Sequence, residues 1–107
     1  MKEFELKNNG TQHLDSKTLL TVSQTFKALG NSTRIRILHL LLNKECSVNE
    51  MAEILGIQQS TISHQLRFLK GIFLVKYRRS GRTLYYSYND KHVMLILEQM
   101  IDHVNHR

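Results

Sequence analysis

Two short helical patterns separated by a single glycine constrain the fold of this 107-residue chain more than any other feature. The first pattern begins at Ser47, which together with Glu50 three residues later makes a capping box, a signal for the start of a helix. Gly56 ends this helix, because glycine readily takes the left-handed conformation that follows a helix. The second pattern begins almost at once and runs from about residue 58 to residue 70. Two helices joined this tightly match the spacing of a helix-turn-helix.

Helical periodicity and one change of pattern predict the rest of the fold. Residues 74–79 and 82–88 are rich in Val, Tyr, Leu and Thr and flank Ser80-Gly81, which predicts a β-hairpin. Further helices are expected over residues 15–29, 31–43 and 90–106. The predicted fold is mainly α with a β-hairpin wing, a winged helix-turn-helix of residues 15–107 that follows a flexible N-terminal arm of residues 1–14.

The charge of the chain is unevenly distributed. Its net charge is +6, and residues 54–89 contain no Asp or Glu although they contain six Lys and Arg residues. A one-sided basic surface favours a nucleic acid as partner, whereas the alternative is a solvated face that keeps the protein soluble. The only cysteine is Cys46, and no apolar run approaches the length of a membrane span. We therefore expect a cytoplasmic location and no membrane partner.

A helical wheel divides the second helix of the motif into two sides. Ile62, Leu66 and Leu69 fall on one side and can anchor the helix to a core. The opposite side carries groups able to hydrogen-bond to base edges or phosphates. They are Gln59, Ser60, Ser63, His64, Arg67 and Lys70. Near the hairpin tip, Arg78, Arg79 and Arg82 are candidates for contacts with phosphates or the minor groove. These nine residues are the predicted double-stranded DNA interface; the alternative is an ordinary polar face.

A family resemblance is carried by two segments, FKALGNSTRIRILHLLL and SVNEMAEILGIQQSTISHQLRFLKGIFLVKYRRSGRTLYYSYND. They resemble the ArsR/SmtB family of bacterial metal-responsive repressors, and the resemblance extends over about residues 18 to 106. Ser32 stands where the family often has Pro, and Ser can also begin a helix. The resemblance implies a homodimer that binds palindromic operator DNA and releases it when an inducer binds.

Four metal-ligand side chains lie at the two ends of the last helix: Asp90, His92, His103 and His106. The three histidines share one face, but His92 and His103 are separated by roughly 16 Å along the axis at ~1.5 Å per residue. Zinc-bound nitrogens lie ~2.0–2.1 Å from the metal, so one chain cannot close this site. Two antiparallel copies in a twofold dimer can, and one carboxylate with three imidazoles suits tetrahedral Zn(II). The alternative is that the histidines are merely exposed and Asp90 is a helix cap.

By resemblance, this ligand pattern is that of the CzrA-type zinc and cobalt sensors, which bind metal at the last helix. It implies Zn(II) as inducer, with Co(II) as the alternative, and control of metal efflux or resistance genes. The family's other common site places a cysteine on either side of a Val. Here Ser47 and Asn49 flank Val48, so we expect no thiolate site and interpret Cys46 as a small apolar filler.

Several alternatives remain open on the sequence alone. His13 could add a ligand for six-coordinate Ni(II), Cys46 could have a redox role, and a constitutive DNA-binding protein would also have a basic wing. An enzyme is not expected. No spacing of catalytic residues is recognisable, there is no Gly-rich phosphate loop, and a closed four-ligand metal site leaves no open coordination position.

Overall fold

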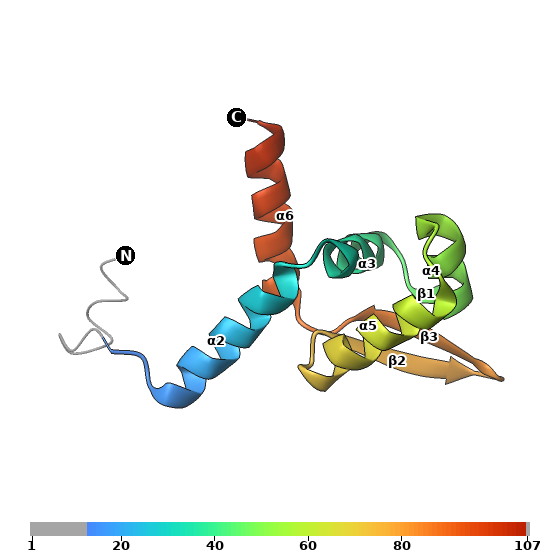
Figure 1. Cartoon of the computed structure of the whole chain (residues 1–107), viewed down its shortest axis with the longest axis horizontal. Coiled ribbons are helices and arrows are strands. Elements are labelled where there is room, and N and C mark those ends of the chain that lie inside the picture. Colours follow the sequence, from blue (N-terminus) through green and yellow to red (C-terminus); the bar gives the residue numbers. More distant parts are fainter. Residues whose placement is uncertain (1–12, 107) are drawn as a thin grey trace.

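The computed structural model describes residues 13–106, so the predicted arm of residues 1–14 lies almost wholly outside the described residues. The elements follow the predicted order (Figure 1). They are α2 (Ser16–Leu29), α3 (Ser32–Asn43), β1 (Cys46–Ser47), α4 (Val48–Leu55), α5 (Gln59–Gly71), β2 (Val75–Ser80), β3 (Thr83–Tyr88) and α6 (Lys91–Asn105). The predicted winged helix-turn-helix is confirmed. No helix within residues 13–106 is long and apolar enough to cross a membrane.

Three of the helices begin at a side chain that caps them. Asp15 Oδ1 accepts a 2.7 Å hydrogen bond from a backbone N–H in the first turn of α2, and Asn31 Oδ1 does the same for α3 at 3.0 Å. At α4, Ser47 Oγ accepts from the backbone N–H of Glu50 at 3.2 Å, and Glu50 Oε1 accepts from the backbone N–H of Ser47 at 2.8 Å. Because these contacts satisfy N–H groups that the helix itself leaves unpaired, short-range sequence signals were enough to locate the helix starts.

The hairpin belongs to a three-stranded antiparallel sheet with strand order β1-β3-β2. Strand β1 was not predicted, since a two-residue strand has no periodicity to detect. It pairs Cys46 with Tyr86 and Ser47 with Tyr85. The wing is thereby hydrogen-bonded to the segment that leads directly into α4, the first helix of the helix-turn-helix.

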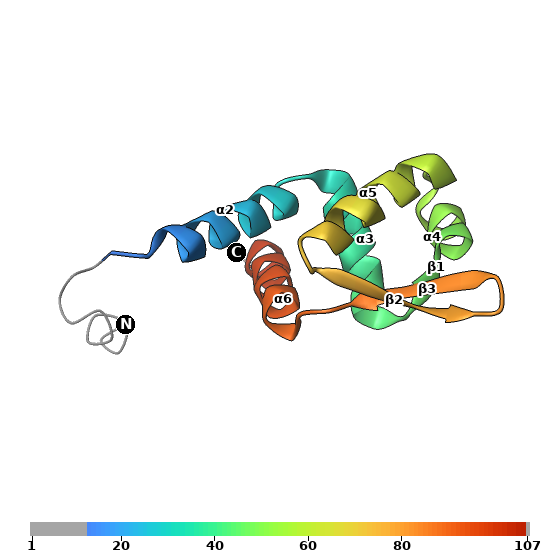
Figure 2. The same cartoon turned by 90° about the horizontal axis from the view of Figure 1, so that it is seen from below.

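One core joins α3, α4 and α5 to the base of the sheet and to the first half of α6. Its buried residues are Ala28, Ile37, Leu38, Leu41, Cys46, Met51, Ile62, Leu66, Leu69, Leu74, Val75, Val93, Met94 and Leu97. Helices α2 and α6 extend from this body at the end remote from the hairpin tip (Figures 1 and 2). They leave many of their apolar side chains uncovered within one chain.

The apolar side chains of α6 pack only partly on the core. Val93 and Leu97 are buried, whereas Met100 and Val104 are 58% and 48% exposed. Ile101, in the second half of the helix, is partly buried against the core. Met100 and Val104 are therefore left uncovered by the rest of one protomer.

Gly56 provides a direct test of the turn between α4 and α5. It adopts φ +67°, and a Cβ built there would meet nothing within 4 Å. Gly56→Ala should therefore lower the free energy of unfolding by about 1–2 kcal/mol through backbone strain alone. Urea unfolding at fixed protein concentration measures this effect.

Gly71→Ala is the matched control, since Gly71 is helical and a Cβ there also meets nothing within 4 Å. That change should leave the free energy of unfolding the same or raise it by up to about 1 kcal/mol. Equal destabilisation by both substitutions would contradict the assignment of strain to the left-handed turn.

Candidate nucleic-acid interface and metal half-sites

Helix α5 presents the predicted polar side to solvent. Ile62, Leu66 and Leu69 have no exposed area and lie in the core. Every side chain predicted to face DNA is exposed: Gln59, Ser60, Ser63, His64, Arg67 and Lys70. The orientation predicted by the helical wheel is confirmed, and the contact of these residues with DNA remains a prediction.

Two arginines of α3 contact the two helices of the helix-turn-helix, and neither contact was predicted from the sequence. Arg34 Nε donates to Gln65 Oε1 at 2.7 Å, and its guanidinium lies 4.0 Å from the centre of the Phe68 ring. Arg36 Nη2 donates to the carbonyl of Leu55 at 2.6 Å, at the carboxyl end of α4. A cation there is favourable for a helix, and together the two arginines tie α3 to both helices of the motif.

A second set of contacts ties the end of α5 to the wing. Lys70 Nζ lies 5.4 Å from the centre of the Tyr77 ring, which in turn is 5.5 Å from the Tyr86 ring at an interplanar angle of 58°. Burial raises the pKa of Tyr86 above its ordinary value, as expected for a phenol packed at the base of the sheet. The wing and α5 therefore present their basic side chains from one connected surface.

The three wing arginines do not have the same environment. Arg78 forms an ion pair with Glu45, in which Nε and Nη2 lie 2.9 and 2.8 Å from the two carboxylate oxygens. Its guanidinium also lies 4.9 Å from the Tyr85 ring centre. Arg79 and Arg82 are exposed, and within residues 13–106 neither forms an ion pair. The structure therefore leaves Arg79 and Arg82 more available to a phosphate than Arg78.

Two of the predicted metal ligands lie together at the start of α6. Asp90 caps the helix, and its Oδ1 accepts from the backbone N–H of His92 at 2.7 Å. The same oxygen lies 3.3 Å from His92 Nδ1, and the imidazole is 92% exposed. Asp90 is therefore a helix cap, as the alternative interpretation stated, but capping and metal ligation are compatible because a carboxylate has two oxygens.

The other two ligands lie at the far end of the same helix. His103 and His106 are both exposed, and His106 Nδ1 lies 2.8 Å from the carbonyl oxygen of Asp102. If Nδ1 donates in this contact, Nε2 is the unprotonated nitrogen, and a metal-binding histidine commonly has this arrangement. Within residues 13–106 of one chain no three His, Cys, Asp or Glu side chains are grouped to hold a metal. Each chain thus holds the four candidate ligands as two separate pairs, one at each end of α6.

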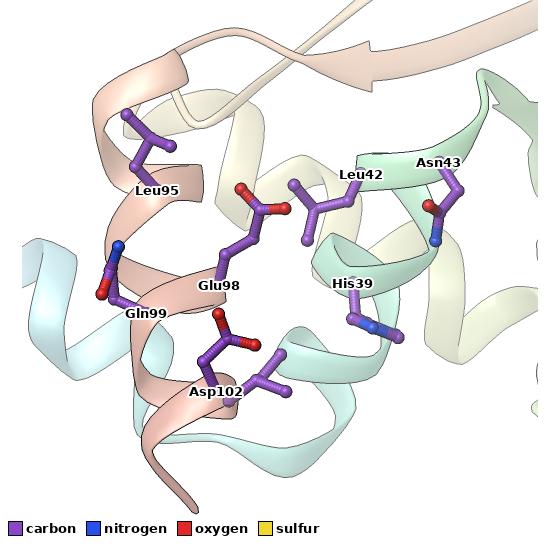
Figure 3. A pocket seen from close by; sticks show the side chains of 8 residues that line it. His39, Leu42, Asn43, Leu95, Glu98, Gln99 and Asp102 are labelled. Carbon is purple, nitrogen blue, oxygen red and sulfur yellow. The ribbon is translucent and has the colours of Figure 1, made fainter. Parts of the chain in front are cut away.

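A hollow of about 290 Å³ lies between α3 and α6 (Figure 3). His39 lines it from α3, and Glu98 and Asp102 line it from α6. His39 is an exposed residue at the rim of this hollow. Because the described residues form no three-ligand group here, we assign it no metal.

Cys46 is fully buried in β1, where its Sγ lies 3.7 Å from the carbonyl of Lys44. Burial raises the pKa of this thiol, so the reactive thiolate is disfavoured. The environment favours the interpretation of Cys46 as an apolar filler over a redox role.

Known proteins of similar sequence identify the class of protein to which the chain belongs. Residues 31–77 match the family model described as "Bacterial regulatory protein, arsR family". The chain is 39% identical to the HTH-type transcriptional regulator NmtR of Mycobacterium tuberculosis, over 95% of this chain and 85% of NmtR. It is 36% identical to a CadC homologue of Staphylococcus aureus, a cadmium resistance transcriptional regulatory protein, over 90% of this chain and 80% of that one.

Two further similarities agree with this class. A transcriptional repressor SmtB homologue of Synechocystis is 40% identical over 78% of this chain and 63% of its own length. The solution structure of the winged helix-turn-helix DNA-binding domain of Mb0332 from Mycobacterium bovis, described as homodimeric, matches with a TM-score of 0.75 and 32% identity, over 91% of this chain and 95% of that domain.

The chain belongs to the ArsR family of bacterial regulatory proteins and is a winged-helix transcriptional regulator. Its relatives are named as regulators and not as enzymes, which agrees with the expectation from the sequence. The relatives carry several different names, so the narrower expectation of a CzrA-type zinc and cobalt sensor is not confirmed by them.

The outward side of α5 generates a prediction about DNA affinity. Arg67→Ala should weaken binding to duplex DNA and lower the dependence of affinity on salt, since fewer counterions are released when one fewer phosphate is neutralised. Ser63→Ala should change the preference between sequences more than the salt dependence. Fluorescence anisotropy titrations at several salt concentrations measure both effects.

Lys17→Ala is the control, because it removes one exposed positive charge from α2, outside the predicted interface. An equal change in salt dependence for Arg67→Ala and Lys17→Ala would mean that only net charge matters and that α5 does not contact DNA.

Proposed function

We propose that this chain is a cytoplasmic, homodimeric repressor that binds operator DNA and releases it when Zn(II) binds between the two α6 helices. Co(II) is the alternative inducer, and the regulated genes would serve metal efflux or resistance. The observation that carries the proposal is the division of four ligands between the two ends of α6. Such a division has a use only if a second copy brings the opposite ends together.

The uncovered apolar surface of α2 and α6 supports the dimer. Leu19, Val22 and Phe26 of α2 are 55%, 41% and 56% exposed. On α6 the exposed apolar side chains are Leu95, Ile96, Met100 and Val104. Large apolar surfaces of this kind mark an interaction site. A second copy is the proposed occupant, and the similar winged helix-turn-helix domain of Mb0332 is described as homodimeric.

Antiparallel packing of two α6 helices would place Asp90 and His92 of one protomer beside the other protomer's histidines at positions 103 and 106. The symmetry gives two equivalent sites, each with one carboxylate and three imidazoles, a donor set that suits four-coordinate Zn(II). The contact at His106 is compatible with this role, because an Nδ1 that donates to the Asp102 carbonyl would leave Nε2 as the nitrogen available to a metal. A bound ion would neutralise charge and fix the crossing of the two helices.

Metal and DNA would then compete through the geometry of the dimer. The two α5 helices must match two half-sites on DNA, so a metal that prefers another crossing of α6 disfavours the DNA-bound arrangement. By linkage, DNA weakens metal binding by the same factor, and a coupling of about 1–3 kcal/mol is usual. We place the coupling between metal and DNA binding at His103. The ring nitrogen of His103 that does not bind the metal needs a hydrogen-bond acceptor, and we propose that this acceptor lies in the Gly71-to-Leu74 stretch after α5.

Two carbonyls of that stretch are already held within the chain. The Phe73 carbonyl accepts from Asn89 Nδ2 at 3.1 Å, and the Leu74 carbonyl accepts from the Asn89 backbone N–H at 2.9 Å. Each carbonyl retains a second lone pair, so an additional donor remains compatible with this arrangement. Within one chain His103 lies roughly 20 Å along α6 from its start at ~1.5 Å per residue, so the donor would have to come from the second protomer. Asn89 also links the stretch to the start of α6, immediately before the ligands Asp90 and His92.

Met100 provides the test of the dimer. Met100→Lys should leave the protomer folded, because Met100 is 58% exposed, but should weaken dimerisation and DNA affinity together. Leu97 is not suitable for this test, since it is 5% exposed and a charge there would disrupt the core of one chain. Sedimentation velocity and DNA titration on the same sample measure the two effects.

The control for this test is Glu98→Lys, which adds positive charge on the side of α6 that faces α3. It should leave the association state unchanged. A monomeric Met100→Lys variant with normal DNA affinity would refute the dimer as the DNA-binding form.

His103 provides the test of the metal site. His103→Ala should keep DNA binding by the metal-free protein and lose the release caused by Zn(II). Co(II)-substituted protein should show tetrahedral ligand-field bands without a strong sulfur charge-transfer band, and Cys46→Ser should not alter them. DNA titration with and without saturating Zn(II), beside absorption spectra, provides the readout, and His39→Ala is the control.

Full release of DNA from the His103→Ala variant by Zn(II) would contradict both the proposed metal site and the proposed coupling through His103. Competition with Ni(II) tests the alternative that the site binds nickel. A six-coordinate site with an added ligand would give octahedral bands.

A further inference from the structure

The ion pair between Arg78 and Glu45 crosses the wing sheet. Glu45 immediately precedes β1, Arg78 stands in β2, and β3 lies between these two strands. Arg78 is paired in register with Tyr85 of β3, over whose ring its guanidinium lies. The Arg78 side chain therefore spans the central strand and reaches a carboxylate on the far side, with two hydrogen bonds of 2.8 and 2.9 Å.

Arg78 and Arg79 lie on opposite faces of the sheet, because neighbouring residues in a strand alternate and the pairing of β2 with β3 is continuous. Arg79 shares its face with Tyr77, the residue contacted by Lys70 at the end of α5. Arg78 is on the other face, toward Glu45. The face that is continuous with the DNA-facing helix therefore contains Arg79 and not Arg78.

Electrostatics disfavours a phosphate contact by Arg78 as well. Its charge is already matched by a carboxylate in a two-pronged arrangement, the favoured geometry for an arginine. Moving the guanidinium to a phosphate would leave the Glu45 carboxylate uncompensated close to a polyanion. Arg79 and Arg82 bear no such penalty, since neither forms an ion pair within residues 13–106.

We propose that Arg78 and Glu45 form a strap across the outer face of the β1-β3-β2 sheet, so that Arg78 positions the wing while Arg79 and Arg82 supply its phosphate contacts. The strap holds the hairpin to β1 and, through the Ser47 cap, to α4. The assignment of the phosphate contacts rests on the proposed DNA-binding function, whereas the strap itself does not.

Charge-matched variants separate positioning from contact. The double variant Glu45→Gln with Arg78→Gln removes the strap without changing net charge, and the reversed double variant Glu45→Arg with Arg78→Glu restores an ion pair of opposite polarity. The probe is a mixed-sequence DNA duplex titrated at several salt concentrations, since phosphate contacts do not depend on sequence. Arg79→Ala is the positive control and should lower the slope of log affinity against log salt by about 0.9 for each phosphate that is no longer neutralised.

The strap predicts an unchanged salt slope for both double variants, a few-fold decrease of affinity for the Gln pair, and near wild-type affinity for the reversed pair. A phosphate contact by Arg78 predicts the opposite, because the reversed pair would place a carboxylate against the phosphate. A reversed pair whose salt slope falls as that of Arg79→Ala does would overturn the assignment of the contacts.

The single cysteine gives a readout that needs no DNA. Cys46 lies in β1 with no exposed area, so its reaction with a thiol-specific disulfide reagent reports the opening of β1 from β3. The Gln pair should react several-fold faster than wild type, and the reversed pair should react at close to the wild-type rate. Equal rates in all three proteins would overturn the strap. Wild-type protein that failed to bind the duplex would instead count against the proposed function and would leave this thiol test decisive for the strap.

Discussion

The burial of one side of α5 is the constraint on which the rest of the structure depends. Ile62, Leu66 and Leu69 are removed completely from solvent, and full burial of such side chains contributes about 1.5–3 kcal/mol each. With those three side chains inside, the polar side of the same helix has to face outward. The interface predicted for DNA therefore follows from hydrophobic packing and not from a dedicated scaffold.

Contacts from neighbouring elements then orient this helix. Arg34 contacts the middle of α5 at Gln65 and Phe68, and Lys70 contacts the wing at Tyr77. Cations on aromatic rings and a hydrogen bond between partly buried groups are directional, unlike apolar packing. They couple α3, α5 and the wing, so a displacement of any one of them would be felt at the surface proposed to meet DNA.

The two ends of the molecule expose different kinds of side chain. At the α5 and wing end, exposed basic side chains favour the binding of a polyanion. At the α2 and α6 end, exposed apolar side chains and the four candidate metal ligands are the basis of the proposed dimer. Both surfaces lie on one protomer, so under the proposed function an ion bound at the dimer end would influence the spacing of two helices at the DNA end.

Much of this could be predicted from the sequence, because the signals were local. Asp15, Asn31 and Ser47 cap the helices that follow them, and helical periodicity separated the inner from the outer side of α5. The spacing of Asp90, His92, His103 and His106 was likewise readable, since a helix converts sequence distance directly into axial distance. Only the tertiary structure decided three other points. It formed the two-residue strand β1, left Met100 and Val104 uncovered, and brought Glu45 to Arg78 across an intervening strand. Each depends on residues distant in sequence, whose meeting is determined by the packing of whole elements and leaves no periodic trace in the chain.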